Sequence, residues 1–526
     1  MSRLKLARRL LMPLLLAPIL SVASAQTTLK AVLNGEVHLI DPIATTNYRT
    51  RDFAYLVWDV LIAVDSKGNY RPQMLESFSA SPDNMSYTFT LRPGLKWSDG
   101  TPVTSQDCIA SIKRWAARDA LGKQLIARTK ALTATSDTTF TLELEKPFGF
   151  VIQSLGKPGS NVPVMMPERL AQTDPTKPVE EVIGSGPFIF KKDEWVPGDR
   201  MVFEKNPHYT PRDEPADGLA GGKHVYVDRV ELITMPDSAT AVAALQTGEI
   251  DYIQRLSFDY LPILEQNPDV VLSPGQKGNG SFIFIARPNH LQPPFDNLKV
   301  RQALQALVDQ KEILSSLGAP AELADECYSV YMCNTPYASD AGTEALRSPS
   351  IEKARKLLEE GGYKGEKVVV LHSADLPTIH FPATVLEEQM RRAGFNVDVQ
   401  ASDYATVAQR RFSKAPIEEG GWSLMPLNWE AFDVGTPLTH YAIAHNCTDG
   451  YPGWSCDEET TRLLAEVIEE TDEDKRRALM DAIQVRAHEN VSLILGGQLT
   501  IVTGYRENLE GVLTEAGLPV FWNIRK

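Results

Sequence analysis

The stretch that decides the fold spans residues 70–115 and reads YRPQMLESFSASPDNMSYTFTLRPGLKWSDGTPVTSQDCIASIKRW. Alternating β-branched and aromatic residues at 87–91 predict a half-buried strand. Turn pairs at 93–94 and 99–100 bracket a second short strand, which we expect to return beside the first. Thr-Ser-Gln-Asp at 104–107 is a capping-box pattern. The stretch therefore predicts a β-hairpin followed by a helix.

The same stretch carries motifs that continue along the chain. They are RPxxLxS at 71–77, TFxLRxGxxWxDGxPxTxxD at 88–107, IGSGPF at 183–188 and NPHY at 206–209. This set resembles the signature of family 5 extracytoplasmic solute-binding proteins, which are the dipeptide, oligopeptide and nickel-complex receptors of ABC importers. The resemblance covers about residues 26–526 and implies a receptor rather than an enzyme.

The chain is too long for one hydrophobic core, because its 526 residues exceed the roughly 250 to 300 at which a single core stops growing. Strands that alternate with helices in its second half predict an α/β fold. The resemblance implies a periplasmic binding protein-like architecture with two lobes, three domains, a ligand cleft and two hinge strands. Its parts are a signal peptide (1–25), lobe I (26–58, 183–274 and 491–526), a small domain inserted in lobe I (59–182) and lobe II (275–490).

Residues 1–25 have the pattern of a cleaved secretory signal. Four basic residues precede an apolar run at 10–20, and Ala-Ser-Ala at 23–25 is a cleavage site. The run is too short and too interrupted by proline for a spanning helix, so a retained anchor is the less favoured alternative. No cysteine follows the cleavage site, and we expect a soluble periplasmic monomer without a lipid anchor.

The balance of charge is acidic. The formal net charge is −15, and removing the four positive charges of the signal takes it to about −19. An acidic protein without a basic, aromatic-interleaved segment is a poor partner for nucleic acid, which we exclude.

Five cysteines in an exported chain suggest two disulfides and one remaining thiol. Sequence alone does not fix the connectivity. We favour local pairs, Cys327 with Cys333 and Cys447 with Cys456, and expect Cys108 to be buried on the apolar face of its helix.

The resemblance also indicates where a ligand is bound. Family members place a ligand-facing loop after the first strand, which makes Thr46, Asn47, Tyr48 and Arg49 candidates; the alternative is a solvated loop. His380 precedes a helix at a position that faces the cleft in oligopeptide receptors, with a surface role as the alternative.

A departure from the family pattern follows Trp422. Peptide-binding members carry an aspartate two to three residues after the matching tryptophan, where it holds the ligand's ammonium, because a buried charge must be paired. Here Leu424 and Met425 occupy those positions, so a free peptide amino terminus is disfavoured. Asp433 is a candidate replacement. Trp422 and Trp429 are candidate aromatic surfaces for a sugar, a ring or a cation, against the alternative of core packing.

Other classes of function have weaker support. No G-x-S-x-G, H-E-x-x-H or Walker sequence is present, and the carboxylate clusters lie on solvated helical faces, so we expect no catalysis and no cofactor. His440, His445 and Cys447 suggest a metal or nickel-complex receptor as one alternative. A chaperone for unfolded chains is another. We predict a receptor that delivers a small peptide-like or conjugated organic solute to a membrane-embedded ABC permease with cytoplasmic ATPases.

Overall fold

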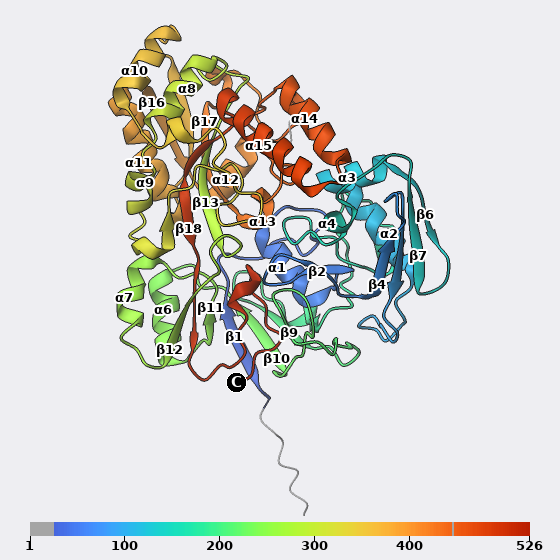
Figure 1. Ribbon diagram of the computed structural model, residues 1–526. Helices are drawn as coiled ribbons and strands as arrows, with labels where there is room; N and C mark the ends of the chain where they lie inside the picture. The colour runs from blue at the N-terminus through green and yellow to red at the C-terminus, as the bar shows by residue number, and fades with distance from the viewer. Residues whose placement is uncertain (1–25, 444–446) are drawn as a thin grey trace, which may run out of the picture.

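Two mixed β-sheets, each covered by helices, organise the chain (Figure 1). The structure is a computed structural model that describes residues 26–443 and 447–526. Lobe I is built on a seven-stranded sheet and lobe II on a six-stranded sheet, with a four-stranded sheet beside them. The α/β, binding protein-like fold that the sequence predicts is therefore confirmed.

Lobe I has a sheet in which the first strand lies at the centre. The strands, in pairing order, are β12 (Val270–Pro274), β19 (Val502–Arg506), β11 (Tyr252–Ile253), β1 (Thr28–Val32), β10 (Arg229–Ile233), β9 (Arg200–Lys205) and β8 (Phe188–Phe190). Its helices include α1 (Tyr48–Val57), α6 (Ser238–Thr247) and α7 (Leu261–Leu264). Because β1 pairs in parallel with β10 on one side and with β11 on the other, it is an interior strand of the sheet.

The stretch at 70–115 belongs to the four-stranded sheet, which contains β4 (Leu75–Ala80), β5 (Ser86–Leu91), β7 (Thr139–Leu144) and β6 (Thr129–Ala134). The helices beside it are α2 (Ser105–Ala116), α3 (Ala120–Ala127), α4 (Val151–Leu155) and α5 (Glu168–Ala171), and β2 (Ile62–Val64) pairs with β3 (Tyr70–Pro72). The predicted strand is β5, and the predicted capping box starts α2: Thr104 N donates to Asp107 Oδ2 at 2.8 Å.

One detail of that stretch differs from expectation. The partners of β5 are β4 and β7, and residues 95–97 do not return beside β5. Instead Trp97 N donates to Thr101 O at 2.8 Å, which folds this segment into a tight turn with a single bridge between Lys96 and Pro102. Trp97 is buried, so its packing decides the course of the chain here.

Lobe II has a sheet with the order β14 (Ala324–Asp325), β18 (Ile494–Thr500), β13 (Ser281–Pro288), β17 (Leu424–Glu430), β15 (Lys367–Ser373) and β16 (Asn396–Ser402). Its helices are α8 (Leu298–Leu307), α9 (Gln310–Ser315), α10 (Ile351–Glu360), α11 (Pro377–Ala393), α12 (Tyr404–Arg410), α13 (Ala431–Val434), α14 (Glu458–Glu469) and α15 (Glu473–Asn490). All eight residues of β13 are buried, including Ser281 and Arg287 at the two sides of its apolar run.

The chain crosses between the lobes twice, at residues 275–280 and at Ile501. The first crossing joins β12 to β13, and the second joins β18 to β19. Gly275 N donates to Ile501 O at 2.8 Å, and Ile501 N donates to Gly280 O at 2.9 Å. The two crossings are therefore hydrogen-bonded to each other and form one joint.

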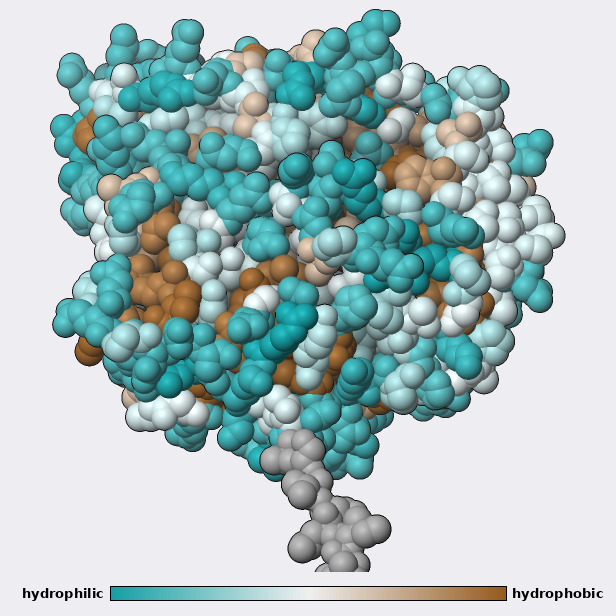
Figure 2. All heavy atoms as spheres, turned by 60° about the horizontal axis from the view of Figure 1, so that its bottom comes forward, coloured by the Kyte–Doolittle hydropathy of each residue, from teal (hydrophilic) through white to brown (hydrophobic). Residues whose placement is uncertain are grey.

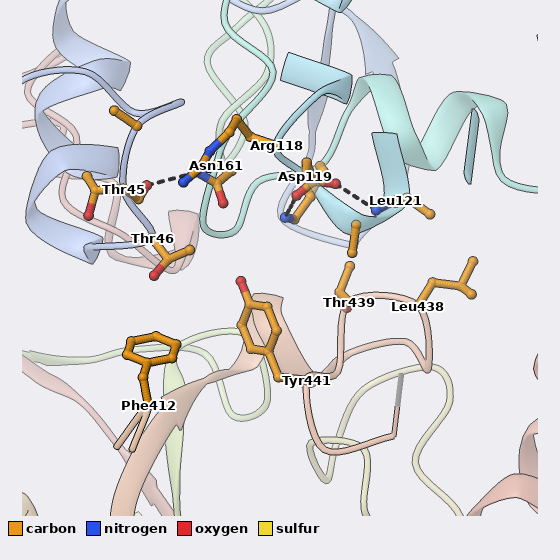
Figure 3. A pocket seen from close by; sticks show the side chains of 13 residues that line it. Thr45, Thr46, Arg118, Asp119, Leu121, Asn161, Phe412, Leu438, Thr439 and Tyr441 are labelled. Carbon is orange, nitrogen blue, oxygen red and sulfur yellow. Dashed lines mark hydrogen bonds and ion pairs between the residues drawn. The ribbon is translucent and has the colours of Figure 1, made fainter. Parts of the chain in front are cut away.

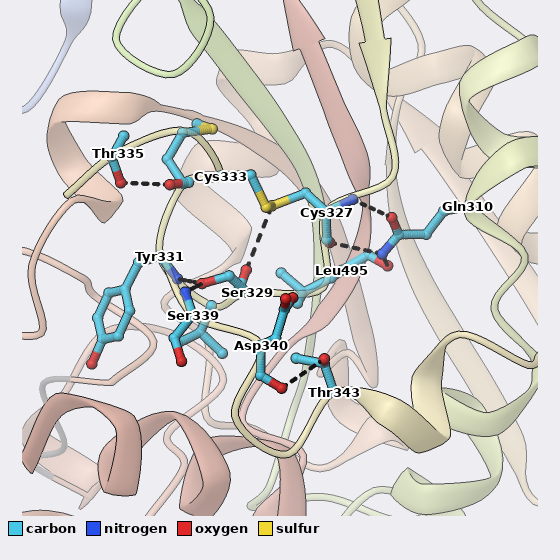
Figure 4. The surroundings of a disulfide bond; sticks show 12 residues. Gln310, Cys327, Ser329, Tyr331, Cys333, Thr335, Ser339, Asp340, Thr343 and Leu495 are labelled. Atoms are coloured by element: carbon cyan, nitrogen blue, oxygen red, sulfur yellow. Dashed lines mark hydrogen bonds between the residues drawn. A yellow bond between two sulfur atoms is a disulfide. The ribbon is translucent and has the colours of Figure 1, made fainter. Parts of the chain in front are cut away.

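Two disulfides close short rings, Cys327 with Cys333 and Cys447 with Cys456. These are the pairs that the sequence favours, and Cys108 is a buried free thiol. Around the first ring, Gln310 holds Cys327 on both sides: Cys327 N donates to Gln310 Oε1 at 2.8 Å, and Gln310 Nε2 donates to Cys327 O at 2.9 Å (Figure 4).

The outer surface is mostly polar. On the face shown in Figure 2, hydrophilic residues cover most of the area and hydrophobic residues gather in separate hollows. Within the described part of the chain, no helix has both the length and the apolar character that a membrane crossing requires.

The ring closed by Cys327 and Cys333 yields a prediction about stability. The double variant Cys327→Ser with Cys333→Ser is expected to lower the free energy of unfolding by roughly 2 kcal/mol, because the unfolded chain regains the freedom of a short loop. Urea denaturation followed by circular dichroism measures the change. Wild-type protein under reductant also loses the disulfide between Cys447 and Cys456, so it should lose at least as much stability. Equal midpoints for the double variant and oxidised wild type would contradict the prediction.

The buried His488, in the last turn of α15, predicts that the stability of the fold depends on pH. Burial lowers its pKa from 6.5 to about 4. Between these values the unfolded chain binds a proton that the folded chain does not, so the free energy of unfolding falls as the pH drops from 6.5 to 4, by up to about 3 kcal/mol. His488→Gln should flatten this slope in urea titrations across the range. The exposed His38→Gln should leave it unchanged, and parallel slopes for all three proteins would refute the assignment.

Candidate ligand-binding site

A cavity of about 430 Å³ lies where loops of the two lobes face each other (Figure 3). One wall comes from the loop after β1, the turn between α2 and α3 and the segment after α4, with Thr45, Thr46, Arg118 and Asn161 among its residues. The other wall comes from lobe II, with Phe412, Thr439 and Tyr441. A solute held here would touch both lobes at once.

Asn161 fixes the lobe I wall. Its backbone is left-handed, with φ at +52°, and its Nδ2 donates to the carbonyl oxygens of Pro42 (2.9 Å), Ile43 (3.2 Å) and Thr45 (2.9 Å). The indole N–H of Trp115 donates to Asn161 O at 2.7 Å. The loop that carries Thr45 and Thr46 is therefore held in place before any ligand arrives.

Asp119 and Lys157 contribute charge to the same wall, but they neutralise each other. The Lys157 ammonium and the Asp119 carboxylate form a buried ion pair. Asp119 Oδ1 also accepts from the backbone N–H groups of Leu121 (2.9 Å) and Gly122 (3.0 Å) at the start of α3. This carboxylate is therefore committed to the fold.

Tyr441 forms the lobe II wall and points its hydroxyl toward the opposing loop (Figure 3). Its ring stacks on Tyr451, with centroids 5.0 Å apart, and Trp429 lies 6.1 Å from it. Burial, together with the charges of Asp433 and Asp119, raises the pKa of Tyr441 well above its ordinary value. The hydroxyl stays protonated and can both donate and accept a hydrogen bond.

The residues predicted after the first strand divide into two groups. Thr46 lines the cavity. Asn47 caps α1, where its Oδ1 accepts from Arg49 N at 2.8 Å. Tyr48 and Arg49 turn toward Glu430 of lobe II, so their contacts lie between the lobes and not on the wall of this cavity.

The predicted residues of lobe II lie one layer behind the cavity wall. Trp422 and Met425 are buried, and the indole N–H of Trp422 donates to Arg411 O at 3.1 Å, directly before the exposed Phe412. Trp429 is also buried and packs against Tyr441. These side chains support the residues that line the cavity.

His380 and Asp433 have partners within the protein. His380 Nδ1 lies 2.7 Å from His372 Nε2, and the second nitrogen of His372 lies 2.7 Å from Glu387. Asp433 accepts from Ser160 across the lobes, from N at 3.0 Å and from Oγ at 2.8 Å. In this arrangement the charge of Asp433 stabilises contact between the lobes.

Sequence reasoning missed a buried ionic cluster centred on Glu430, which we call the Glu430 cluster. The carboxylate of this lobe II residue lies 2.8 Å from Arg51, 3.3 Å from Arg255 and 3.7 Å from Arg49, all in lobe I. Arg51 also pairs with Asp52 at 2.7 Å. Tyr48 Oη accepts from Glu430 N at 3.3 Å, across 382 residues of sequence, a separation that no local pattern reveals.

The cluster keeps Glu430 ionised. Burial alone would raise the pKa of its carboxyl, but the charges of Arg51, Arg255 and Arg49 outweigh burial and lower the pKa below its ordinary value. Burial lowers the pKa of Arg255 to about 10, which leaves it charged at neutral pH. The lobes are thus closed on each other through charged, desolvated contacts.

The described residues contain no group of three or more histidine, cysteine or acidic side chains arranged to hold a metal ion. Of the predicted trio, His440 Nε2 lies 2.9 Å from Val330 O, and Cys447 is in a disulfide. His445 lies outside the described residues.

Comparison with known proteins was made on sequence and on structure. The family model for bacterial extracellular solute-binding proteins, family 5 Middle, matches residues 69–450. A probable peptide ABC transporter periplasmic-binding protein of Sinorhizobium fredii is 35% identical over 517 residues, covering 98% of this chain and 96% of that protein. A glutathione-binding protein of Pectobacterium atrosepticum is 26% identical, covering 74% of this chain and 72% of the relative.

Two solved structures share the fold at 21% identity. One is the binding protein AgaA from A. tumefaciens R10 in complex with agropinic acid, with a TM-score of 0.79, covering 95% of this chain and 98% of that one. The other is a dipeptide-binding protein from Pseudoalteromonas sp. SM9913 in complex with Met-Leu. Its TM-score is also 0.79, and the match covers 95% of this chain and 100% of that one.

The Glu430 cluster predicts how the closed form depends on one side chain. Glu430→Gln should weaken closure by about 3 kcal/mol, because three buried arginines lose a charged partner. Small-angle X-ray scattering of the unliganded protein should then show a larger radius of gyration. The exposed Glu419→Gln, also in lobe II, is the matched control; scattering curves that coincide for all three proteins would contradict the role of the cluster.

Proposed function

The chain belongs to family 5 of the bacterial extracellular solute-binding proteins, and from this membership we propose that it captures a small peptide-like or conjugated organic solute in its inter-lobe cavity. The solute is then delivered to an ABC permease driven by cytoplasmic ATPases. The family is one of receptors and not of enzymes. The chain accordingly binds its solute and releases it unchanged.

The cavity with walls from both lobes is the main support for this proposal. Thr46 and Asn161 face Tyr441 and Thr439 across it, so a bound solute completes the contact between two bodies joined at one hinge. A ligand that binds the closed form more tightly than the open form drives closure by that difference in affinity. Capture and release therefore need only rotation about the joint formed by residues 275–280 and Ile501.

The route of the protein follows from the same proposal. The segment 1–25 is removed during secretion, and the mature chain works in the periplasm as a monomer without a lipid anchor. Residues 59–182 act as a domain inserted in lobe I, which otherwise comprises 26–58, 183–274 and 501–526, and lobe II is residues 275–500. The boundary predicted at residue 490 moves to Ile501, because β18 (Ile494–Thr500) pairs with β13 in the lobe II sheet. The permease docks on the outer surfaces of both lobes, since it must sense their closure.

Each predicted site residue has a place in this scheme. Thr46 contacts the solute. Asn47 holds the start of α1, and Tyr48, Arg49 and Asp433 bind the lobes to each other. Trp422, Met425 and Trp429 support the contact residues from behind, whereas His380 pairs with His372 within lobe II.

A binding experiment tests the proposal. Native mass spectrometry of the purified protein, followed by thermal-shift measurements with dipeptides, oligopeptides, opines and glycosides, should reveal one compound class that raises the melting temperature. Tyr441→Phe should weaken binding of that class about 5- to 10-fold, because a neutral hydrogen bond is lost. The exposed Phe381→Ala should bind as wild type does. If no compound binds and no small molecule co-purifies, the receptor role is wrong.

A further inference from the structure

The cavity continues into a second and larger one, of about 760 Å³. Leu121, Lys157 and Thr439 line both, so the two spaces adjoin each other, and we call them together the cleft. The second cavity also reaches the hinge, where Gln276 and Asn279 line it. A solute that fills the cleft therefore has two parts in different surroundings.

Some of the charged side chains that line the cleft have an ion-pair partner and others have none. Both carboxylates are engaged: Asp119 pairs with Lys157, and Glu473 pairs with Arg476. Lys277 pairs with Asp325 at 2.9 Å. Among the described residues, Arg118 and Lys67 line the cleft with no ion-pair partner; both are exposed, so a bound solute would be what covers them. The lining thus offers unpaired positive charge and no unpaired negative charge, in a protein whose net charge is −15.

This imbalance discriminates between solutes by charge. An ammonium group placed in the cleft would meet cations and carboxylates that already have partners, and a desolvated charge without a partner is costly. A carboxylate would meet the guanidinium of Arg118, which donates in the fork geometry that carboxylates match. The hydroxyls of Thr45, Thr46 and Tyr441, on the walls of the same cavity, add donors around it.

The second cavity has a different character. Its lining combines the amides of Asn69, Gln153 and Asn334 with the rings of Tyr70, Tyr337 and Phe432. Amides both donate and accept, as hydroxyl groups require, and aromatic faces pack against the C–H faces of sugars and polyols. Such a lining suits an uncharged, hydroxyl-rich body.

The wall that carries Asn334 and Tyr337 is rigid. It follows directly on the ring closed by Cys327 and Cys333, and Thr335 Oγ1 donates to Met332 O at 2.5 Å (Figure 4). The Arg477 guanidinium lies 5.6 Å from the centre of the Tyr337 ring. These contacts tie this wall of the second cavity to the disulfide ring and to α15.

We infer that the solute is an acidic conjugate, with a carboxylate held by Arg118 in the smaller cavity and an uncharged polyhydroxyl body in the larger one. This inference rests on the receptor function proposed above and narrows its substrate class. It assigns Arg118 as the residue that selects for the acid.

Matched synthetic compounds test the inference by isothermal titration calorimetry. The acid probe is N-gluconoyl-L-glutamate, and its uncharged counterpart is N-gluconoyl-L-glutamine amide. Wild-type protein should bind the acid at least 10-fold more tightly than the amide. Arg118→Gln should weaken the acid about 10- to 100-fold and change the amide less than 2-fold, and Arg118→Lys should restore part of the loss. The exposed Lys123→Gln, on α3, makes the same change of charge away from the cleft and should bind as wild type does.

Three results would overturn the inference while leaving the receptor role intact. The first is tighter binding of the amide, or of the dipeptide Ala-Ala, than of the acid. The second is an equal loss of affinity for acid and amide in Arg118→Gln. The third is binding only of compounds without a carboxylate. Failure of every compound in this set and in the thermal-shift panel would overturn the receptor role itself, and the inference with it.

Discussion

The structure depends on one joint, where the chain crosses between the lobes twice and the two crossings hydrogen-bond to each other. Gly275 and Gly280 both pair with Ile501, so the lobes cannot slide or separate without breaking main-chain bonds. Rotation is the motion that remains. This rotation opens and closes the cleft. A solute contacts the residues of both walls only when the walls approach each other.

Away from the joint, charged groups contribute to closure beside a hydrophobic cluster that contains residues of both the small inserted domain and lobe II. Glu430 enters a set of lobe I arginines, and Asp433 accepts from Ser160. Buried ion pairs are weak sources of net stability, because both charges lose water, but they require one geometry. They therefore fix how the lobes meet. In the closed arrangement the cleft between them therefore has one defined shape, with Arg118 and Tyr441 on its walls.

Local patterns predicted the local structure well. The capping box of Thr104 and Asp107, the strand β5 and the two short disulfide rings all depend on residues close in sequence. The site was predictable only in part. Thr46 follows from its place after the first strand, whereas Arg118, Asn161 and Tyr441 come together only through tertiary folding, and no motif marks them. Trp422 and Trp429 were identified by type, but packing places them behind the wall, because a large ring adds most when it is fully buried.

The Glu430 cluster also bears on how the lobes part. Its ion pairs must take up water again before the lobes separate, so the barrier to opening includes the rupture of desolvated charge pairs. Departure of a solute held between the lobes requires the same rupture. A partner that binds the open arrangement more tightly than the closed one would favour opening by that difference in affinity.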